Sequence, residues 1–301
     1  MSGTWQLSLT GLAVGALVGM TGMGGGSLMT PILILLFNFD PKVAVGTDIL
    51  HGAVFKTFGA TRHRMLGTVH ARLTFWMFLG SGPLSLLGVQ LADWLSNHYG
   101  EGVESAEGKA VGAALILGGF GFLAKTFLHK RTGSDMPFRL RKRDRVLAFG
   151  IGAICGFVVG LTSVGSGTFF GLAMLLAFPL TAARIVGTDI FHAAALLWVA
   201  GLGHLLHHNV NGHAMAWLLV GSIPGVLIGS QLSLGIPERL LRVGFSVVLV
   251  LSGIKLLRVP QANWVIVIGL SVAAGALLTW MLARRLARPR VGAEGARHEP
   301  L

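Results

Sequence analysis

The sequence GMTGMGGGS, residues 19–27, lies in an apolar stretch that has no charged residue from Met1 to Phe39. Five of its nine residues are glycine, which is the poorest helix former after proline. The flanking segments 7–20 and 27–38 are short for full crossings, since a membrane helix needs roughly 20 apolar residues. We therefore expect two short helices that meet at a break within the membrane. Such backbone must face protein or a wet cavity, because lipid cannot satisfy its amide groups.

The composition is that of an all-α, polytopic integral membrane protein. The 301 residues are 53% hydrophobic and only 12% charged, and their mean hydropathy is +0.72, whereas an average soluble domain is about 25% charged. Uncharged runs cover 73–92, 146–183, 190–237 and 259–283. These runs are continuous rather than alternating, which argues against a transmembrane β-barrel. At about 20 residues per crossing, we expect roughly 8–11 membrane segments.

The net charge of +12 is better explained by membrane topology than by nucleic acid binding. Basic residues gather in the segment 129–145 and at Arg284, Arg285 and Arg288. Basic loops beside membrane segments mark the cytoplasmic side, and anionic lipid headgroups attract them. The segment 93–109 is acidic and is expected outside. The N-terminus lacks a basic n-region, so we expect no cleavable signal peptide.

The glycine-rich break belongs to an internal repeat. GLTSVGSGT at 160–168 is the counterpart of 19–27, and VGTDIFH at 186–192 is the counterpart of VGTDILH at 45–51. Both pairs are 141 positions apart, and at that offset 26 of the 81 residues from 11 to 91 are identical to their counterparts. We infer a duplication of the membrane part of the chain.

Charge favours an inverted arrangement of the two halves, with a parallel arrangement as the alternative. Four cations in the loop after VGTDILH have counterparts without a fixed charge: Lys56, Arg62, Arg64 and Arg72 against Leu197, Gly203, Leu205 and His213. A loop that loses its cations has changed sides of the membrane under the positive-inside rule. Transporters built from inverted repeats place broken helices around a site at the membrane midplane.

The glycines fall into two classes. One class is four residues apart, a spacing that lets helices pack closely: Gly11, Gly15, Gly19, Gly152, Gly156 and Gly160. The adjacent Gly24, Gly25 and Gly26 suit a helix start whose free N–H groups bind an anion; a structural kink is the alternative. The candidate substrate-binding residues are Thr21, Gly24, Gly25, Gly26, Ser27, Thr162, Gly165, Ser166, Gly167 and Thr168.

The VGTD motif has two interpretations, a structural one and a functional one. In the first, its Thr and Asp residues cap a helix N-terminus. In the second, an Asp and the His three residues later lie on one helical face and carry a proton coupled to transport, or orient the His toward an anion. The residues concerned are Thr47, Asp48, His51, Thr188, Asp189 and His192.

The duplicated glycine-rich break, the P-x-L stretch after it and the repeated VGTD together resemble the TauE/SafE-type sulfite exporters, the toluene sulfonate uptake permease family. The resemblance covers roughly 7–258. It implies secondary transport of small sulfur-containing or organic anions, such as sulfite, sulfonates or thiosulfate, across the bacterial inner membrane by a multi-pass protein. The family's break falls on 22–27 and 163–168 and its VGTD on 45–48 and 186–189. The second break departs from the pattern, with GSG in place of GGG.

Other function classes find less support. The segment 204–213 holds His204, His207, His208 and His213, so a divalent metal transporter or metal-regulated membrane protein is the alternative. It has no cysteine ligand, and we expect no metal site. No nucleophile–base arrangement or nucleotide-binding GxxxxGK[ST] motif is present, so we expect no enzyme activity. The expected partners are a small anion and the lipid bilayer, with a homo-oligomer left open, and no cofactor is implied.

These observations divide the chain into five parts. We expect a first membrane repeat over 1–128, a basic cytoplasmic linker over 129–145, a second membrane repeat over 146–258, an extra C-terminal membrane helix over 259–284, and a polar tail over 285–301.

Overall fold

The computed structural model describes residues 4–21, 26–99, 106–127, 138–232 and 238–262, with Trp264 and Ser271; within these ranges the side chains of 19–21, 26–27, 99, 229–232 and 238–241 are not described. The ordered elements of the described residues are all helices, as the sequence predicted. They are α1 (Thr4–Thr21), α2 (Gly26–Phe37), α3 (Pro41–Met65), α4 (Ala71–Tyr99), α5 (Ala106–Phe127), α6 (Lys142–Thr162), α7 (Phe169–Ala177), α8 (Ala182–Leu206), α9 (Gly212–Leu232) and α10 (Glu238–Leu256).

Several helices have the length and composition of membrane spans. Helices α4, α5, α6 and α8 are long and apolar enough to cross a bilayer, and shorter apolar helices lie in α1, α2 and α9. Their outward faces carry large apolar side chains, such as Leu117 and Ile154, which are 62% and 71% exposed. A lipid environment covers such surfaces without the cost they have in water. The polytopic α-helical class is therefore confirmed. The expected extra helix at 259–284 lies largely outside the described residues.

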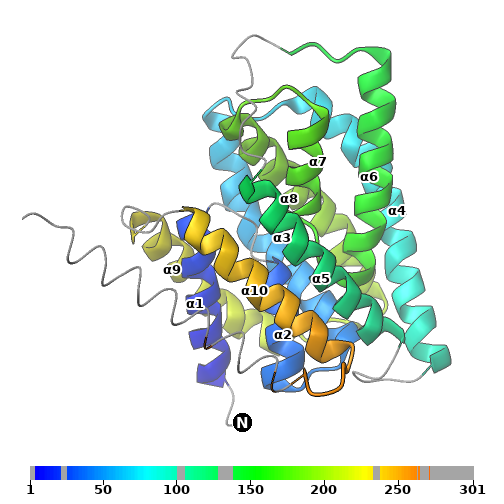
Figure 1. The fold of residues 1–301 in the computed structure, drawn as a ribbon, viewed down its shortest axis with the longest axis vertical. Coiled ribbons are helices and arrows are strands. Elements are labelled where there is room, and N and C mark those ends of the chain that lie inside the picture. The colour runs from blue at the N-terminus through cyan, green and yellow to red at the C-terminus, as the bar shows by residue number, and fades with distance from the viewer. Residues whose placement is uncertain are drawn as a thin grey trace, which may run out of the picture.

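Helices from the two halves pack on each other (Figure 1). The main pairs are α1 with α9, α4 with α6, α3 with α8 and α5 with α10. At the repeat offset α1 corresponds to α6, and α4 corresponds to α9. The first two pairs are thus counterparts of each other, and the third pair joins α3 to its own counterpart α8. Helices α5 and α10 follow in the same order along the two halves. This reciprocal packing supports a duplication, which stays an interpretation of the sequence.

Glycines permit the two closest helix pairs. A Cβ at Gly15 of α1 would lie 2.8 Å from the Cα of Ser222 in α9, and one at Gly156 of α6 would lie 2.5 Å from the Cα of Ser81 in α4. Gly11, Gly152 and Gly160 meet the partner helix's backbone in the same way. The packing role predicted for these five glycines is confirmed, and the surroundings of Gly19 lie outside the described residues.

Counterpart helices run in opposite directions through the molecule. At one end, which we call the linker end, the backbone N–H of His70 donates to Thr188 Oγ1 over 3.0 Å, and His70 Nε2 lies 2.9 Å from the carbonyl oxygen of Phe138. At the opposite end, which we call the far end, Gly46 contacts the backbone of Asn209. Helix α3 therefore begins at the far end and α8 begins at the linker end (Figure 1). This is the relation that an inverted repeat requires.

Candidate functional site

The second glycine-rich break separates two helices at its predicted place. Helix α6 ends at Thr162 and α7 begins at Phe169. Between them, Ser163, Gly165 and Gly167 have φ angles of 61°, 117° and 113°, in the left-handed region that glycine tolerates best. The Ser163 N–H closes α6 by donating to the Val159 carbonyl over 2.8 Å. The chain thus turns back within the molecule.

The first break is described only at its edges. Helix α1 ends at Thr21 and α2 begins at Gly26. The candidates Gly24 and Gly25 lie outside the described residues, as do the side chains of Thr21 and Ser27. The roles proposed for the five candidates in this break stay predictions.

Buried hydroxyl groups line the second break. Ser163, Ser166 and Thr168 are each at most 1% exposed. Ser163 Oγ donates to Asp48 Oδ2 over 2.8 Å, and Thr168 Oγ1 has no hydrogen-bond partner among the described residues. Thr162 serves the local fold, since its hydroxyl donates to Val158 and accepts from the N–H of Val164.

Lys56 contacts this break from the first half of the chain. Its Nζ donates to Ser166 Oγ over 2.9 Å and lies 3.4 Å from the Ser166 carbonyl oxygen. The Lys56 side chain is only 3% exposed. Its positive charge interacts electrostatically with the carboxyl groups of both Asp189 and Asp48. The sequence placed Lys56 in a loop with Arg62 and Arg64, and this was wrong: it lies inside α3, more than two turns before the helix ends at Met65.

Asp48 lies where both halves meet. Its Oδ2 accepts a hydrogen bond from Thr30 Oγ1 of α2 over 2.5 Å, besides the one from Ser163. Its Oδ1 is buried without a hydrogen-bond partner among the described residues. Leaving a buried carboxylate oxygen without a hydrogen bond costs free energy. This oxygen is therefore a place where a proton, a water molecule or a donor group of a ligand can bind.

The capping interpretation of VGTD is wrong. Asp40 is the N-cap of α3 and accepts from the Lys42 N–H over 3.0 Å, whereas Thr47 and Asp48 lie about two turns further along. Helix α8 likewise begins at Ala182, well before Thr188 and Asp189.

The two threonines of the motif hold the starts of other helices instead. Thr47 Oγ1 accepts from the N–H of Asn211, immediately before α9, over 2.9 Å. Thr188 Oγ1 accepts from the N–H of His70, immediately before α4. Asn211 and His70 in turn accept from the first turns of those helices, at Ala214 and Leu73. Each motif therefore anchors the opposite half.

The two histidines of the motif also reach the opposite half. His51 Nε2 lies 2.8 Å from Ser222 Oγ in α9, and His192 Nε2 lies 2.9 Å from Ser81 Oγ in α4. These contacts are related by the repeat offset. The hydrogen bonds described for Asp48 go to hydroxyls rather than to His51, and both histidines keep a buried Nδ1 without a described partner. The Asp and the His thus belong to neighbouring rather than shared networks.

Asp189 has a different neighbour from Asp48. A Cβ added at Gly171 of α7 would lie 2.5 Å from Lys125 Nζ and 3.3 Å from Asp189 Oδ2. Gly171 therefore leaves room for a buried lysine of α5 beside the second aspartate. Gly171 is the counterpart of Thr30, which donates to Asp48 in the first half. Sequence reasoning missed Lys56, Lys125 and Thr30; the signal available was two lysines within otherwise apolar helical segments.

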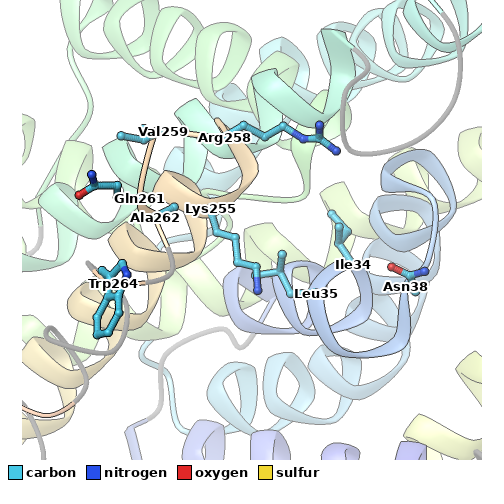
Figure 2. A pocket seen from close by; sticks show the side chains of 9 residues that line it. All are labelled: Ile34, Leu35, Asn38, Lys255, Arg258, Val259, Gln261, Ala262 and Trp264. Carbon is cyan, nitrogen blue, oxygen red and sulfur yellow. The ribbon is translucent and has the colours of Figure 1, made fainter.

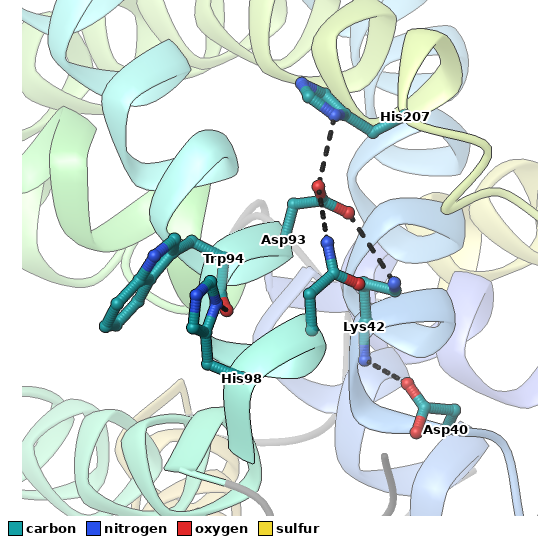
Figure 3. Close-up of polar contacts among 7 residues, drawn as sticks. Asp40, Lys42, Asp93, Trp94, His98 and His207 are labelled. Carbon is teal, nitrogen blue, oxygen red and sulfur yellow. Dashed lines mark hydrogen bonds and ion pairs between the residues drawn. The ribbon is translucent and has the colours of Figure 1, made fainter. Parts of the chain in front are cut away.

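The histidine cluster of the metal alternative is dispersed. His204 Nε2 lies 2.9 Å from the buried Gly160 carbonyl oxygen, and the His213 ring lies beside Trp217. His207 faces Asp93, which also pairs with Lys42 (Figure 3), at 3.5 Å in each case. No group of three or more potential metal ligands occurs among the described residues, so the metal interpretation finds no support.

A surface pocket of about 590 Å³ lies at the far end, between the last turns of α2 and α10 (Figure 2). Lys255 and Arg258 line it together with the amide side chains of Asn38 and Gln261. None of the predicted site residues lines it.

Comparisons with known proteins agree with one another over most of the chain. The model of the family described as "Sulfite exporter TauE/SafE" matches residues 7–256. The probable membrane transporter protein YjnA of Bacillus subtilis is 38% identical over 256 residues, which cover 84% of this chain and 99% of that protein. The probable membrane transporter protein MJ0441 of Methanocaldococcus jannaschii is 23% identical over 269 residues, which cover 83% and 94%.

A match to an enzyme is partial. An undecaprenyl-diphosphatase of Myxococcus xanthus is 29% identical over 165 residues, which cover 55% of this chain and 52% of that protein. No solved structure matches the chain.

Proposed function

Because the chain belongs to the TauE/SafE sulfite exporter family, it is a multi-pass membrane transporter and not an enzyme, and we propose that it carries small anions, namely sulfur-containing oxoanions or organosulfonates. The observation that carries this proposal is the contact of Lys56 with Ser166. It is a buried cation bound to a non-helical break inside a membrane protein. Ionisable groups at such depth are expensive and usually serve transport.

The chemistry around the break suits an oxoanion. Lys56 offers an ammonium group, and Ser166 and Thr168 offer hydroxyls. Helix α7 starts at Phe169, and its N-terminus adds partial positive charge at the break. The N–H groups of Thr168 and Phe169 donate to the Gly165 carbonyl oxygen. Charge-assisted hydrogen bonds from several directions are how proteins hold oxygen-rich anions. The sulfur class itself comes from the family.

Transport would proceed by movement of one half against the other. We propose that the halves are inverted repeats, which the reciprocal packing of α1 on α9 and of α6 on α4 supports. The contacts His51–Ser222 and His192–Ser81 join the halves at equivalent places. If one contact breaks while the other is kept, the site opens first to one side of the membrane and then to the other.

The VGTD residues are proposed to couple this movement to a proton. Asp48 and Asp189 are each buried with one carboxylate oxygen unpartnered among the described residues, and so are the Nδ1 atoms of His51 and His192. These are groups that can accept or release a proton without breaking a described hydrogen bond.

The proposal is tested by transport in proteoliposomes. Purified protein is reconstituted, and uptake of labelled sulfite, thiosulfate, sulfate, a small sulfonate, phosphate and chloride is measured with and without a pH gradient. We expect uptake of one or more sulfur anions well above that of protein-free liposomes. Uptake of only phosphate or chloride would contradict the sulfur class, and uptake of no anion, with a divalent cation transported instead, would overturn the function.

A further inference from the structure

Both lysines buried in the centre of the described structure come from the first half of the chain, although the fold is built from two similar halves. We propose that the transporter has one anion site rather than two equivalent ones, that this site is at the second break, residues 163–168, and that Lys56 and Lys125 supply its positive charge. The inference rests on the proposed function, since it requires an anionic substrate.

The first observation concerns the counterpart of Lys56. Lys56 corresponds to Leu197, which is buried at 1% exposure, whereas Lys125 lies beyond residues 11–91, over which the repeat offset was established. Leu197 cannot attract an anion. The second half therefore lacks a cation at the place equivalent to Lys56, and its buried Arg242 lies in α10 instead.

The second observation concerns the two aspartates. Asp48 receives hydroxyl donors from Thr30 and Ser163. At the place equivalent to Thr30, Gly171 has no side chain, and Lys125 Nζ lies there beside Asp189. Lys56 and Lys125 both act on Asp189. Lys56 also acts on Asp48, so the cluster holds two ammonium groups and two carboxylates. It has a surplus positive charge when Asp48 carries the proton proposed above.

The third observation is a set of buried polar atoms around this break that have no hydrogen-bond partner among the described residues. They are Thr168 Oγ1, Asp189 Oδ1 and His192 Nδ1. Thr168 and His192 are both fully buried. The centroid of the His192 ring lies 4.4 Å from that of Phe170, the second residue of α7. Buried polar groups are normally paired. Several unpaired buried polar groups around one break, next to two cations, indicate that a polar ligand binds there and supplies their hydrogen-bond partners.

The charge balance selects the ligand. With Asp48 protonated, one oxoanion of charge −1, such as hydrogen sulfite or a sulfonate, neutralises the surplus of Lys56 and Lys125 over Asp189. It can accept from the ammonium of Lys56 and the hydroxyl of Thr168 at once. An uncompensated charge is costly away from water, so a cation is rejected.

The test is anion binding by the full-length protein in nanodiscs, measured by titration calorimetry with sodium sulfite, thiosulfate, sulfate, methanesulfonate and chloride. Lys56→Gln should weaken binding roughly 10- to 100-fold, the range for loss of a charge-assisted hydrogen bond, and Lys125→Gln should weaken it in the same direction. Lys109→Gln removes the same charge from an exposed position of α5 and should leave the dissociation constant within about twofold.

Two further variants keep the test independent of folding. Lys56→Arg retains the charge and should keep part of the affinity if Lys56→Gln gives no folded protein. Ser166→Ala removes only the hydroxyl that accepts from Lys56. The proton of this hydroxyl can be donated to the anion, so its loss should weaken binding by a few-fold, because a neutral hydrogen-bond donor contributes about 1 kcal/mol. Thermal unfolding of each variant confirms that the protein is folded.

The outcomes separate this inference from the proposed function. Sulfite binding by the wild type that is unchanged in both Lys56→Gln and Lys125→Gln would overturn the inference and leave the function intact. Chloride binding that depends on Lys56, without binding of any sulfur anion, would support the site and contradict the substrate class. A stoichiometry of two equivalent anions per chain would overturn the single site.

Discussion

At the scale of single residues, Asp48 is the group on which the proposed proton coupling depends. Its Oδ2 is held by the hydroxyls of Thr30 and Ser163, while its Oδ1 faces no described donor. Asp48 also feels the charge of Lys56, whereas Asp189 feels the charges of both Lys125 and Lys56. An aspartate near one ammonium group takes up a proton more readily than one near two. The two copies of VGTD are therefore not expected to be equivalent.

We predict that Asp48→Asn uncouples transport from protons. The amide oxygen can still accept from Thr30 and Ser163, so the fold should be retained, but the side chain can no longer carry a proton. Anion binding should persist, and flux measured in proteoliposomes should no longer respond to an imposed pH gradient.

Asp189→Asn is the matched comparison. Because its neighbours are lysines, loss of this carboxylate should alter anion affinity more than the response to pH. If Asp48→Asn, Asp189→Asn and the double variant all keep wild-type flux and wild-type pH response, proton coupling through VGTD is wrong.

At the scale of elements, small residues bring helices of opposite halves into backbone contact. Helix α6 presents Gly152, Gly156 and Gly160 to α4, at Met77, Ser81 and Ser85. The same face of α4 supplies Ser81 to His192. The close approach therefore does two things: it joins the halves and it brings a hydroxyl within reach of a buried histidine.

Two glycines of α6 that lie two residues apart test this packing. Gly152→Ala places a Cβ 2.9 Å from the carbonyl carbon of Met77, whereas Gly150→Ala meets nothing within 4 Å. Gly152→Ala should destabilise the protein by about 1–3 kcal/mol, the cost of overpacking a tight interface. Gly150→Ala should be neutral or stabilising by up to about 1 kcal/mol, since alanine is the better helix former.

Thermal unfolding in detergent, with the yield of monodisperse protein as a second measure, distinguishes the two variants. Equal behaviour of Gly150→Ala and Gly152→Ala would contradict the packing role of the glycine row.

At the scale of the whole molecule, charge is divided between the two ends. Basic residues dominate the described part of the linker end, with Asp144 as an acidic neighbour: Arg62, Arg64, Arg72, Arg139, Arg141, Lys142, Arg143, Arg145 and Arg184. At the far end Lys42, Lys109, Lys255 and Arg258 are accompanied by Asp40, Asp93 and Glu107. From the positive-inside rule we predict that the linker end lies in the cytoplasm.

This orientation predicts the accessibility of two exposed positions. In a Cys155→Ala background, a cysteine replacing His208 at the far end should react with an impermeant maleimide in intact cells. A cysteine replacing Arg141 at the linker end should react only after lysis. Labelling of position 208 only after lysis would contradict the orientation. If position 141 also required lysis, the inverted arrangement would be contradicted as well.

The sequence by itself determined the helical membrane class, the position of the second break and the packing glycines. Each of these depends on local properties: apolar runs long enough for a bilayer, residues that cannot continue a helix, and a four-residue spacing that any helix places on one face. The offset of 141 residues also linked the positions that later proved to make equivalent contacts, such as His51 with Ser222 and His192 with Ser81.

Only the tertiary structure decided which residues meet at the site. The VGTD residues looked like helix caps because a glycine precedes them, but α3 and α8 start earlier, and each threonine anchors a helix of the other half. Lys56 looked like a loop cation, yet it reaches Ser166, 110 positions away. Contacts between the halves depend on how helices of different repeats cross. That crossing is fixed by close backbone packing across the whole bundle, which no local pattern in the sequence encodes.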